Sequence, residues 1–215
     1  ERLAEAKYDF EGVDEPEDED WITTLEIDSK GKFLSTSQNL NTIFQKDPKL
    51  KNKFSLNLFD FRPYAVSNLA WRKIKSLEPL KNVDYSGVRN YLETVYGITG
   101  AQKIEDVLNL ELEKNSFHPI KDYLDSLVWD KVKRVDTLLV EYFGVDDTIY
   151  TREAIRKPLT AAVARIYEAG TKFDLVLTLV GKEGTSKSSF FALLGGKWFS
   201  DTFLTVNGKE ALEQI

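Results

Sequence analysis

The chain contains no cysteine and a single histidine, His118. Disulfides and thiolate metal sites are therefore excluded, and a zinc site built on histidine is implausible. No apolar run approaches the ~18 residues of a membrane span, and no signal-peptide pattern opens the sequence. These absences favour a folded cytosolic protein without membrane contact, whose metal chemistry, if it has any, is of the magnesium type.

Methionine is also absent, and the sequence begins at Glu1. We therefore expect the chain to be a piece of a longer protein, at its N-terminus at least. Its 215 residues give room for one large domain or two small ones, and an apolar content of 42% is enough for a buried core.

The net charge of −6 is concentrated at the N-terminus. Residues 1–20 carry ten acids against Arg2 and Lys7, which gives −8 and leaves +2 for the other 195 residues. An acid-rich stretch of this kind predicts a flexible lead-in. A mimic of nucleic acid is the less favoured interpretation of the same charges.

Periodicity predicts two further regions before the C-terminal part. In residues 21–82, the alternating apolar residues of 54–58 indicate a strand, and the whole stretch is typical of a small α/β region. Residues 83–148 are expected to be helical, with Asp84 as the N-cap of the first helix and His118 in a structural role.

The strongest motif lies near the C-terminus. Residues 173–180 (FDLVLTLV) form a short apolar run that is typical of a buried central strand. A glycine-containing turn follows at 181–189 (GKEGTSKSS), and the next residues predict a helix from Ser188 to Leu194. Strand, glycine turn, Lys-Ser and helix together are the context in which phosphate-binding loops occur.

The residue types in this turn fit a nucleotide phosphate. Glycines let backbone N–H groups approach an anion closely, and a helix N-terminus favours negative charge. Lys187 can reach the β- and γ-phosphates, and the Ser188 hydroxyl can ligate Mg²⁺. We therefore expect ATP and Mg²⁺ as cofactors, with Lys187 catalytic and Ser188 as the metal ligand; the site comprises Gly181, Lys182, Glu183, Gly184, Thr185, Ser186, Lys187, Ser188 and Ser189.

One position departs from the phosphate-loop pattern G-x-x-x-x-G-K-[ST]. Ser186 stands where the second glycine belongs, so we expect one backbone angle to be compromised. The alternative is an ordinary turn between a strand and a helix, with a surface lysine.

Basic residues also recur in clusters that could follow a phosphate backbone, although solvated surface charge is the favoured interpretation. These clusters are Lys46, Lys49, Lys51 and Lys53, then Arg72, Lys73 and Lys75, and finally Lys131, Lys133 and Arg134.

Several segments together resemble the virulence-associated protein E family. They are FHPIKDYL at 117–124, LVWD at 127–130, Arg134, YTR at 150–152, AAVAR at 161–165, KFD at 172–174, the phosphate loop, and WFSD at 198–201. The resemblance spans about residues 100–215. It implies a phage, prophage or pathogenicity-island protein of the bacterial cytoplasm, similar to superfamily 3 and poxvirus-type primase-helicases. Such proteins are ATPases that couple hydrolysis to translocation on DNA, as ring homo-oligomers working with phage or host replication proteins.

The expected fold is an α+β N-terminal part with a helical middle region, followed by the start of an α/β P-loop NTPase domain at 149–215. Hydrolysis also needs an acid on the next core strand and an arginine from a neighbouring subunit. Asp201, Glu210 and Glu213 are the nearby acids, and none ends an apolar strand. We therefore expect the full-length protein to be an ATPase and helicase, and this polypeptide to hydrolyse ATP poorly alone.

Two other functions remain open from the sequence. One is a non-enzymatic interaction module of a mobile element with a degenerate loop. The other is a small-molecule kinase, which is disfavoured because no substrate-binding residues accompany the loop.

Overall fold

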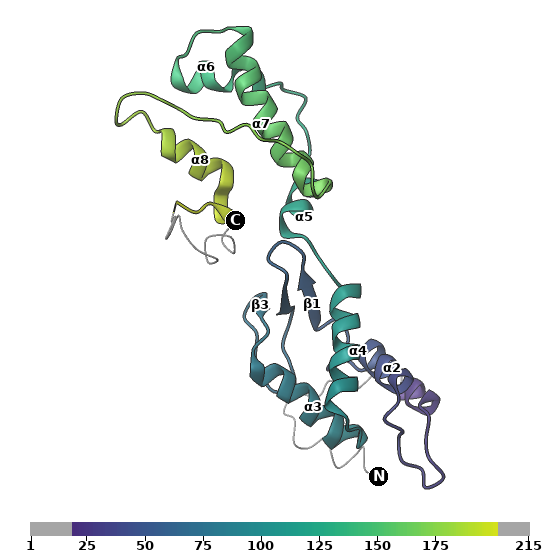
Figure 1. Cartoon of the computed structure of the whole chain (residues 1–215). Helices are drawn as coiled ribbons and strands as arrows, with labels where there is room; N and C mark the ends of the chain where they lie inside the picture. Colours follow the sequence, from purple (N-terminus) through teal and green to yellow (C-terminus); the bar gives the residue numbers. More distant parts are fainter. Residues whose placement is uncertain (1–18, 202–215) are drawn as a thin grey trace. The chain divides into compact units, whose positions relative to one another are not determined.

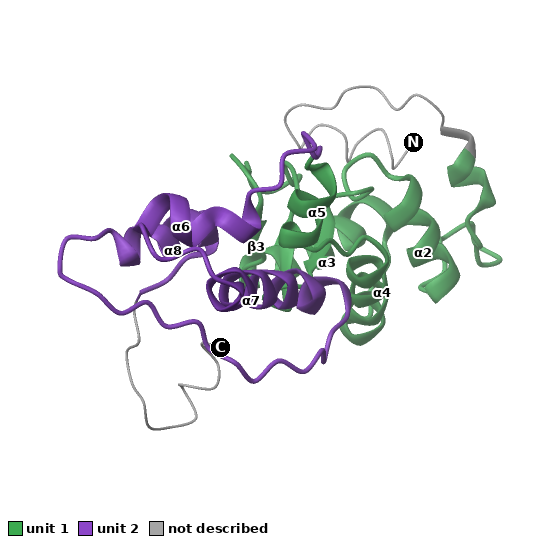
Figure 2. Cartoon of the chain, turned by 90° about the horizontal axis from the view of Figure 1, so that it is seen from above, with its two compact units in different colours: residues 1–127 green, residues 128–215 purple. Residues whose placement is uncertain are grey.

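The computed structural model describes residues 19–201 (Figure 1). Most of the acidic lead-in predicted for residues 1–20 lies outside the described residues, as do Glu210 and Glu213. The chain divides into two compact units, residues 1–127 and 128–215, which Figure 2 shows in green and purple. Within residues 19–201, no helix has the length and apolar character needed to cross a membrane.

The first unit combines helices with a small antiparallel sheet, so the α+β prediction for it is confirmed. The sheet has the order β1-β2-β3, and Phe54 of β1 is paired with Ala65 of β2. Its elements are η2 (Glu19–Thr24), α2 (Ser37–Lys46), β1 (Phe54–Asn57), β2 (Arg62–Ala65), β3 (Glu78–Pro79), α3 (Asn82–Tyr96), α4 (Ala101–Lys114) and α5 (Pro119–Ser126).

The core of this unit lies where α2 and β1 meet α4, and Figure 1 shows α4 beside β1. The rings of Phe44 and Phe54 meet edge to face with their centroids 6.1 Å apart. Leu40, Leu92 and Leu108 are almost completely buried with them. Each such side chain stabilises the fold by about 1.5–3 kcal/mol relative to an exposed position.

Asp84 was predicted to be the N-cap of α3, and this prediction is wrong. The N-cap is Lys81, and Asp84 is the third helical residue. The carboxylate of Asp84 accepts a hydrogen bond from the Lys81 backbone N–H at 2.8 Å, so it does satisfy an N-terminal group of the helix. Asp84 lies three residues after the N-cap because its main partner is the guanidinium of Arg72, at 2.7 Å.

The second unit contains only helices as regular structure among the described residues. They are η3 (Val135–Thr137), α6 (Leu138–Phe143), α7 (Ile149–Tyr167), α8 (Lys187–Gly195) and η4 (Gly196–Trp198). Leu139 of α6 and Ile155 of α7 are buried. Arg156 of α7 ties η3 to this helix through an ion pair with Asp136, at 2.6 Å. The helix predicted after the glycine turn is confirmed as α8.

The strand predicted at residues 173–180 does not form. Within the described residues, no backbone hydrogen bond joins 174–180 to another segment. Val176 is 87% exposed and Val180 is 93% exposed, although both were expected to be buried. A strand exists only through pairing with neighbours, and β-propensity without that pairing leaves an extended segment. The α/β sheet expected around the turn is therefore not present in the described residues.

Candidate functional site

The segment that leads into the glycine turn is anchored to the end of α7. Arg165 donates a hydrogen bond from Nη2 to the carbonyl oxygen of Phe173 at 2.9 Å, and one from Nε to that of Thr171 at 3.2 Å. Sequence reasoning gave Arg165 no role of its own. Only the place of Arg165 in the family resemblance indicated that it matters. A side chain that donates to backbone carbonyls requires no periodic pattern in the sequence, so this contact could not be predicted.

Two residues of the turn have left-handed backbone, one of them at the second glycine position of the pattern. Gly184 has a φ of 80°, and Ser186 has a φ of 56° and a ψ of 23°, both in the left-handed region. Ser186 thus takes up the glycine-like conformation despite its side chain. Left-handed backbone costs a residue with a Cβ about 1–2 kcal/mol.

The loop closes around the ammonium group of Lys187. Its Nζ atom donates hydrogen bonds to the carbonyl oxygens of Gly181 at 3.0 Å and Lys182 at 2.6 Å, and to Thr185 Oγ1 at 3.0 Å. The Thr185 hydroxyl itself donates to the Lys182 carbonyl at 2.9 Å. Four predicted site residues from both ends of the turn are therefore brought together. The lysine charge lies inside the loop instead of extending into solvent.

Helix α8 begins at Lys187 without a side-chain cap. A serine at an N-cap normally adopts extended backbone and accepts from the helix, but the left-handed conformation of Ser186 prevents this. Within the described residues, the backbone N–H groups of Lys187, Ser188 and Ser189 have no hydrogen-bond acceptor. Unpaired N–H donors and the positive end of a helix dipole are features that favour anions.

The donor set suits magnesium better than a metal held by protein alone. The described residues contain no group of three or more His, Cys, Asp or Glu side chains that could hold a metal ion. Mg²⁺ in nucleotide sites takes few protein ligands and completes its shell with phosphate oxygens and water. Ser188 is exposed at the first turn of α8, so its hydroxyl fits that role. Asp201 is exposed and belongs to no strand.

Three residues outside the loop that had been weighed as functional have structural partners. His118 caps α5 by accepting a hydrogen bond at Nδ1 from the Lys121 backbone N–H, at 3.2 Å. Arg72 is paired with Asp84. Arg134 is paired with Asp130, and the bidentate hydrogen bonds from Arg134 lower the pKa of that exposed carboxyl to about 2.

Replacing Ser186 with glycine is expected to stabilise the second unit by about 0.5–1 kcal/mol. The change relieves left-handed strain of ~1–2 kcal/mol, and the greater freedom of glycine in the unfolded chain removes ~0.5–1 kcal/mol of that gain. Urea unfolding of both proteins measures the difference. The same change at Ser189, in the first turn of α8, should destabilise by about 0.5 kcal/mol. Equal destabilisation at both positions would contradict the strained conformation of Ser186.

The part of the chain that contains this loop is similar to a known protein family. Residues 124–215 match the model of the Virulence-associated protein E-like domain, which covers α6, α7, the anchored segment, the loop and α8. The resemblance read from the sequence is thereby confirmed for this part of the chain. No curated protein matches the chain.

Proposed function

We propose that this virulence-associated protein E-like domain binds ATP with Mg²⁺ through residues 181–189. It serves as the nucleotide-binding part of an ATP-dependent, helicase-like DNA replication protein of a phage, prophage or pathogenicity island. The observation that carries the proposal is the closure of the loop around Lys187, next to a helix N-terminus with free donors.

Each group in the loop has a distinct role in the proposed complex. The phosphate oxygens accept hydrogen bonds from the free N–H groups at the start of α8. The Lys187 ammonium neutralises charge on the β- and γ-phosphates as a point charge. The Ser188 hydroxyl would hold Mg²⁺, which would supply further charge neutralisation at the phosphates. The loop thus supplies binding and charge neutralisation, which dominate catalysis of phosphoryl transfer.

Turnover needs more than the loop. An acid beside the Mg²⁺ and an arginine across a subunit interface complete such sites. Within the described residues, no strand ending in an acid follows α8. We therefore assign binding without efficient hydrolysis to this polypeptide alone. DNA, a ring of identical subunits and replication proteins in the bacterial cytoplasm are the proposed partners of the whole protein.

A second candidate function is an interaction module whose loop no longer binds nucleotide. The left-handed conformation of Ser186 favours this second function, because the residue is strained and carries a side chain where the phosphate-loop pattern has glycine. The two functions predict opposite outcomes in one titration.

Replacing Lys187 with alanine is expected to weaken binding of a non-hydrolysable ATP analogue with Mg²⁺ about 10- to 150-fold. The lost contact is a charge-assisted hydrogen bond worth roughly 1.5–3 kcal/mol. Isothermal titration calorimetry of the 215-residue chain gives both dissociation constants. Lys172→Ala is the matched control, because Lys172 is exposed outside the loop and pairs with Asp174 at 3.4 Å.

Equal affinities for the wild type and Lys187→Ala would reject the phosphate-loop function. An absence of any binding by the wild type would favour the interaction module. A loss as large in Lys172→Ala as in Lys187→Ala would show nonspecific attraction of the polyanion to basic residues.

A further inference from the structure

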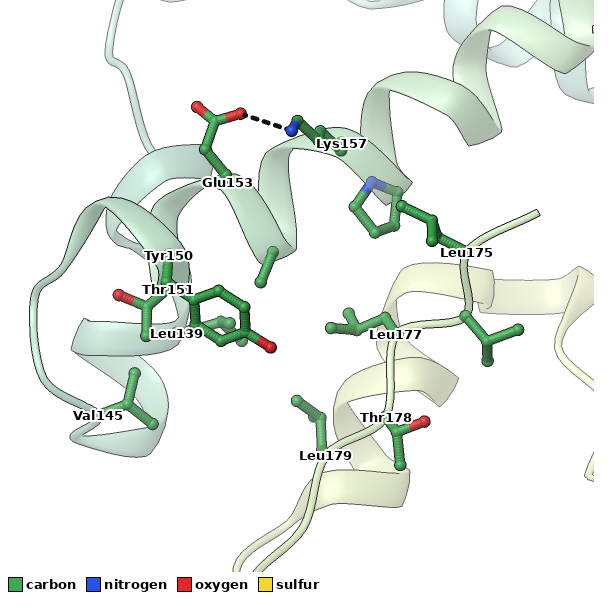
Figure 3. A pocket seen from close by; sticks show the side chains of 13 residues that line it. Leu139, Val145, Tyr150, Thr151, Glu153, Lys157, Leu175, Leu177, Thr178 and Leu179 are labelled. Atoms are coloured by element: carbon green, nitrogen blue, oxygen red, sulfur yellow. Dashed lines mark ion pairs between the residues drawn. The ribbon is translucent and has the colours of Figure 1, made fainter. Parts of the chain in front are cut away.

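A cavity of about 500 Å³ lies within the second unit, between helices α6 and α7 and residues 175–179 (Figure 3). Tyr150 and Ala154 of α7 form one wall with Leu139 of α6, and Leu177 and Leu179 form the opposite wall. Pockets for small molecules and cofactors typically measure ~300–1,000 Å³ and have largely apolar walls. The cavity therefore has the size and lining of a ligand site.

An aromatic ring projects into this cavity instead of packing in the core. In Figure 3 the phenol of Tyr150 points from α7 toward Leu177 and Leu179. The side chain is 80% exposed, and its hydroxyl has no hydrogen-bond partner within the described residues. The first turn of α7 is held firmly, since Thr148 and Thr151 cap each other reciprocally. The ring thus stands on a fixed element with one face free, as a stacking partner requires.

The cavity offers few free polar groups. The carboxylate of Glu153, at its rim, is already paired with Lys157 and Arg156. The hydroxyl of Thr151 is engaged in hydrogen bonds with the Asp146 and Thr148 carbonyls. A flat and mainly apolar group that gains by stacking fits such a space better than a sugar or an anion.

The chain connects this cavity directly to the phosphate loop. Leu179, in the cavity wall, is two residues before Gly181, so their Cα atoms are at most ~7 Å apart. A ligand whose phosphates lie on residues 181–189 therefore has its remaining part within reach of the same wall. Among flat groups, the one that occupies the cavity is therefore expected to be part of the same ligand that binds the loop.

We propose that the cavity receives the nucleobase of the bound nucleoside triphosphate, with the base stacked on Tyr150. This inference rests on the proposed function, because it takes the phosphates to lie on the loop. Tyr150 is a binding residue that contacts the base, whereas Lys187 contacts the phosphates. Base and phosphates are thus recognised by different elements of one domain.

The test compares two probes, a non-hydrolysable ATP analogue and inorganic tripolyphosphate, both with Mg²⁺. Tyr150→Ala should weaken the ATP analogue roughly 5- to 150-fold, as loss of a stacking ring does. It should leave tripolyphosphate unchanged. Tyr150→Phe should bind both probes like the wild type, because the ring is retained. Ala154→Leu, which narrows the cavity beside Tyr150, should reproduce the selective loss.

A matched control is available on the neighbouring helix. Tyr142 of α6 is 72% exposed and does not line the cavity, so Tyr142→Ala should bind both probes like the wild type. Lys187→Ala should weaken both probes.

The outcomes separate this inference from the proposed function. If Tyr150→Ala and Ala154→Leu bind ATP normally while Lys187→Ala weakens both probes, the base lies elsewhere and the inference is overturned. It is equally overturned if Tyr150→Ala weakens tripolyphosphate as strongly as ATP, because Tyr150 then acts through the fold of the loop. If Lys187→Ala changes neither probe, the proposed function itself fails.

Discussion

Replacement of Arg72 with leucine is expected to lower the free energy of unfolding of the first unit by about 3–5 kcal/mol, because it leaves a buried carboxylate without its counter-ion. Asp84 is fully buried and receives two hydrogen bonds from this arginine, from Nε at 3.0 Å and from Nη2 at 2.7 Å. Arg72 also binds Glu78 at 2.6 Å. Urea unfolding followed by tryptophan fluorescence gives the difference, since Trp71 Nε1 donates to the same carboxylate.

Two variants sharpen this prediction. Arg62→Leu replaces an exposed arginine of the same unit and should change stability by no more than about 0.5 kcal/mol. The double variant Arg72→Leu, Asp84→Leu removes both charges and should recover part of the loss. If the double variant is no more stable than Arg72→Leu alone, the cost does not come from an uncompensated charge.

The same carboxylate gives the first unit a pH dependence. Burial alone raises the pKa of Asp84, but the hydrogen bonds from Arg72, the Lys81 N–H and Trp71 outweigh it, so the pKa lies below its ordinary value. The stability that it contributes is therefore present above about pH 4. It is lost as the pH falls through the lowered pKa.

Replacement of Asp47 with alanine is expected to lower the free energy of unfolding of the first unit by about 2–5 kcal/mol, because two buried tyrosine hydroxyls lose the carboxylate that accepts their hydrogen bonds. Oδ2 of Asp47 accepts hydrogen bonds from Tyr91 and from Tyr96, both at 2.7 Å. All three side chains belong to the buried core of the first unit. Chemical denaturation measures the loss, and Asp106→Ala, an exposed carboxylate on α4, is the control with an expected change below about 0.5 kcal/mol.

A second background isolates the cause. In a Tyr91→Phe, Tyr96→Phe protein, no hydroxyls depend on the carboxylate, so Asp47→Ala should cost clearly less. An equal cost in both backgrounds would mean that the other hydrogen bond of this carboxylate, which Oδ1 accepts from the Lys49 backbone N–H at 2.8 Å, carries the effect. Burial raises the pKa of both tyrosines well above the ordinary value for tyrosine, and the nearby charge of Asp47 raises it further. Their contribution is present below about pH 10 and is lost as the pH rises beyond it.

Local patterns predicted the parts of the fold that local interactions determine. The helical periodicity of α3 and α4 and the terminating Gly97, which has a φ of 66°, follow from neighbouring residues alone. Partnerships across the chain were missed. Asp84 was interpreted as a cap because Arg72, twelve residues earlier, shows no periodic link to it. The strand at 173–180 was overpredicted because its apolar run does not determine pairing partners.

In the candidate site, too, local patterns were predicted from the sequence and contacts between residues were not. The loop residues were predicted from their spacing, because the phosphate-loop pattern places glycine, lysine and serine in a fixed order. The return of Lys187 onto the loop carbonyls could not be deduced, since every backbone offers the same acceptors. Tyr150 had no role of its own beyond its place in the family resemblance, because one tyrosine in the first turn of a helix is usually packed or solvated. Only the fold shows that it points into a cavity.

The extended segment 173–180 also matters for how the protein behaves at high concentration. It presents apolar and β-branched side chains together with free backbone donors and acceptors on both of its edges within the described residues. Such a surface is a template for adding strands from either side. While the segment is uncovered, self-association through it competes with binding of other partners by the domain. A single charge introduced at Val176 should therefore raise the solubility of the protein.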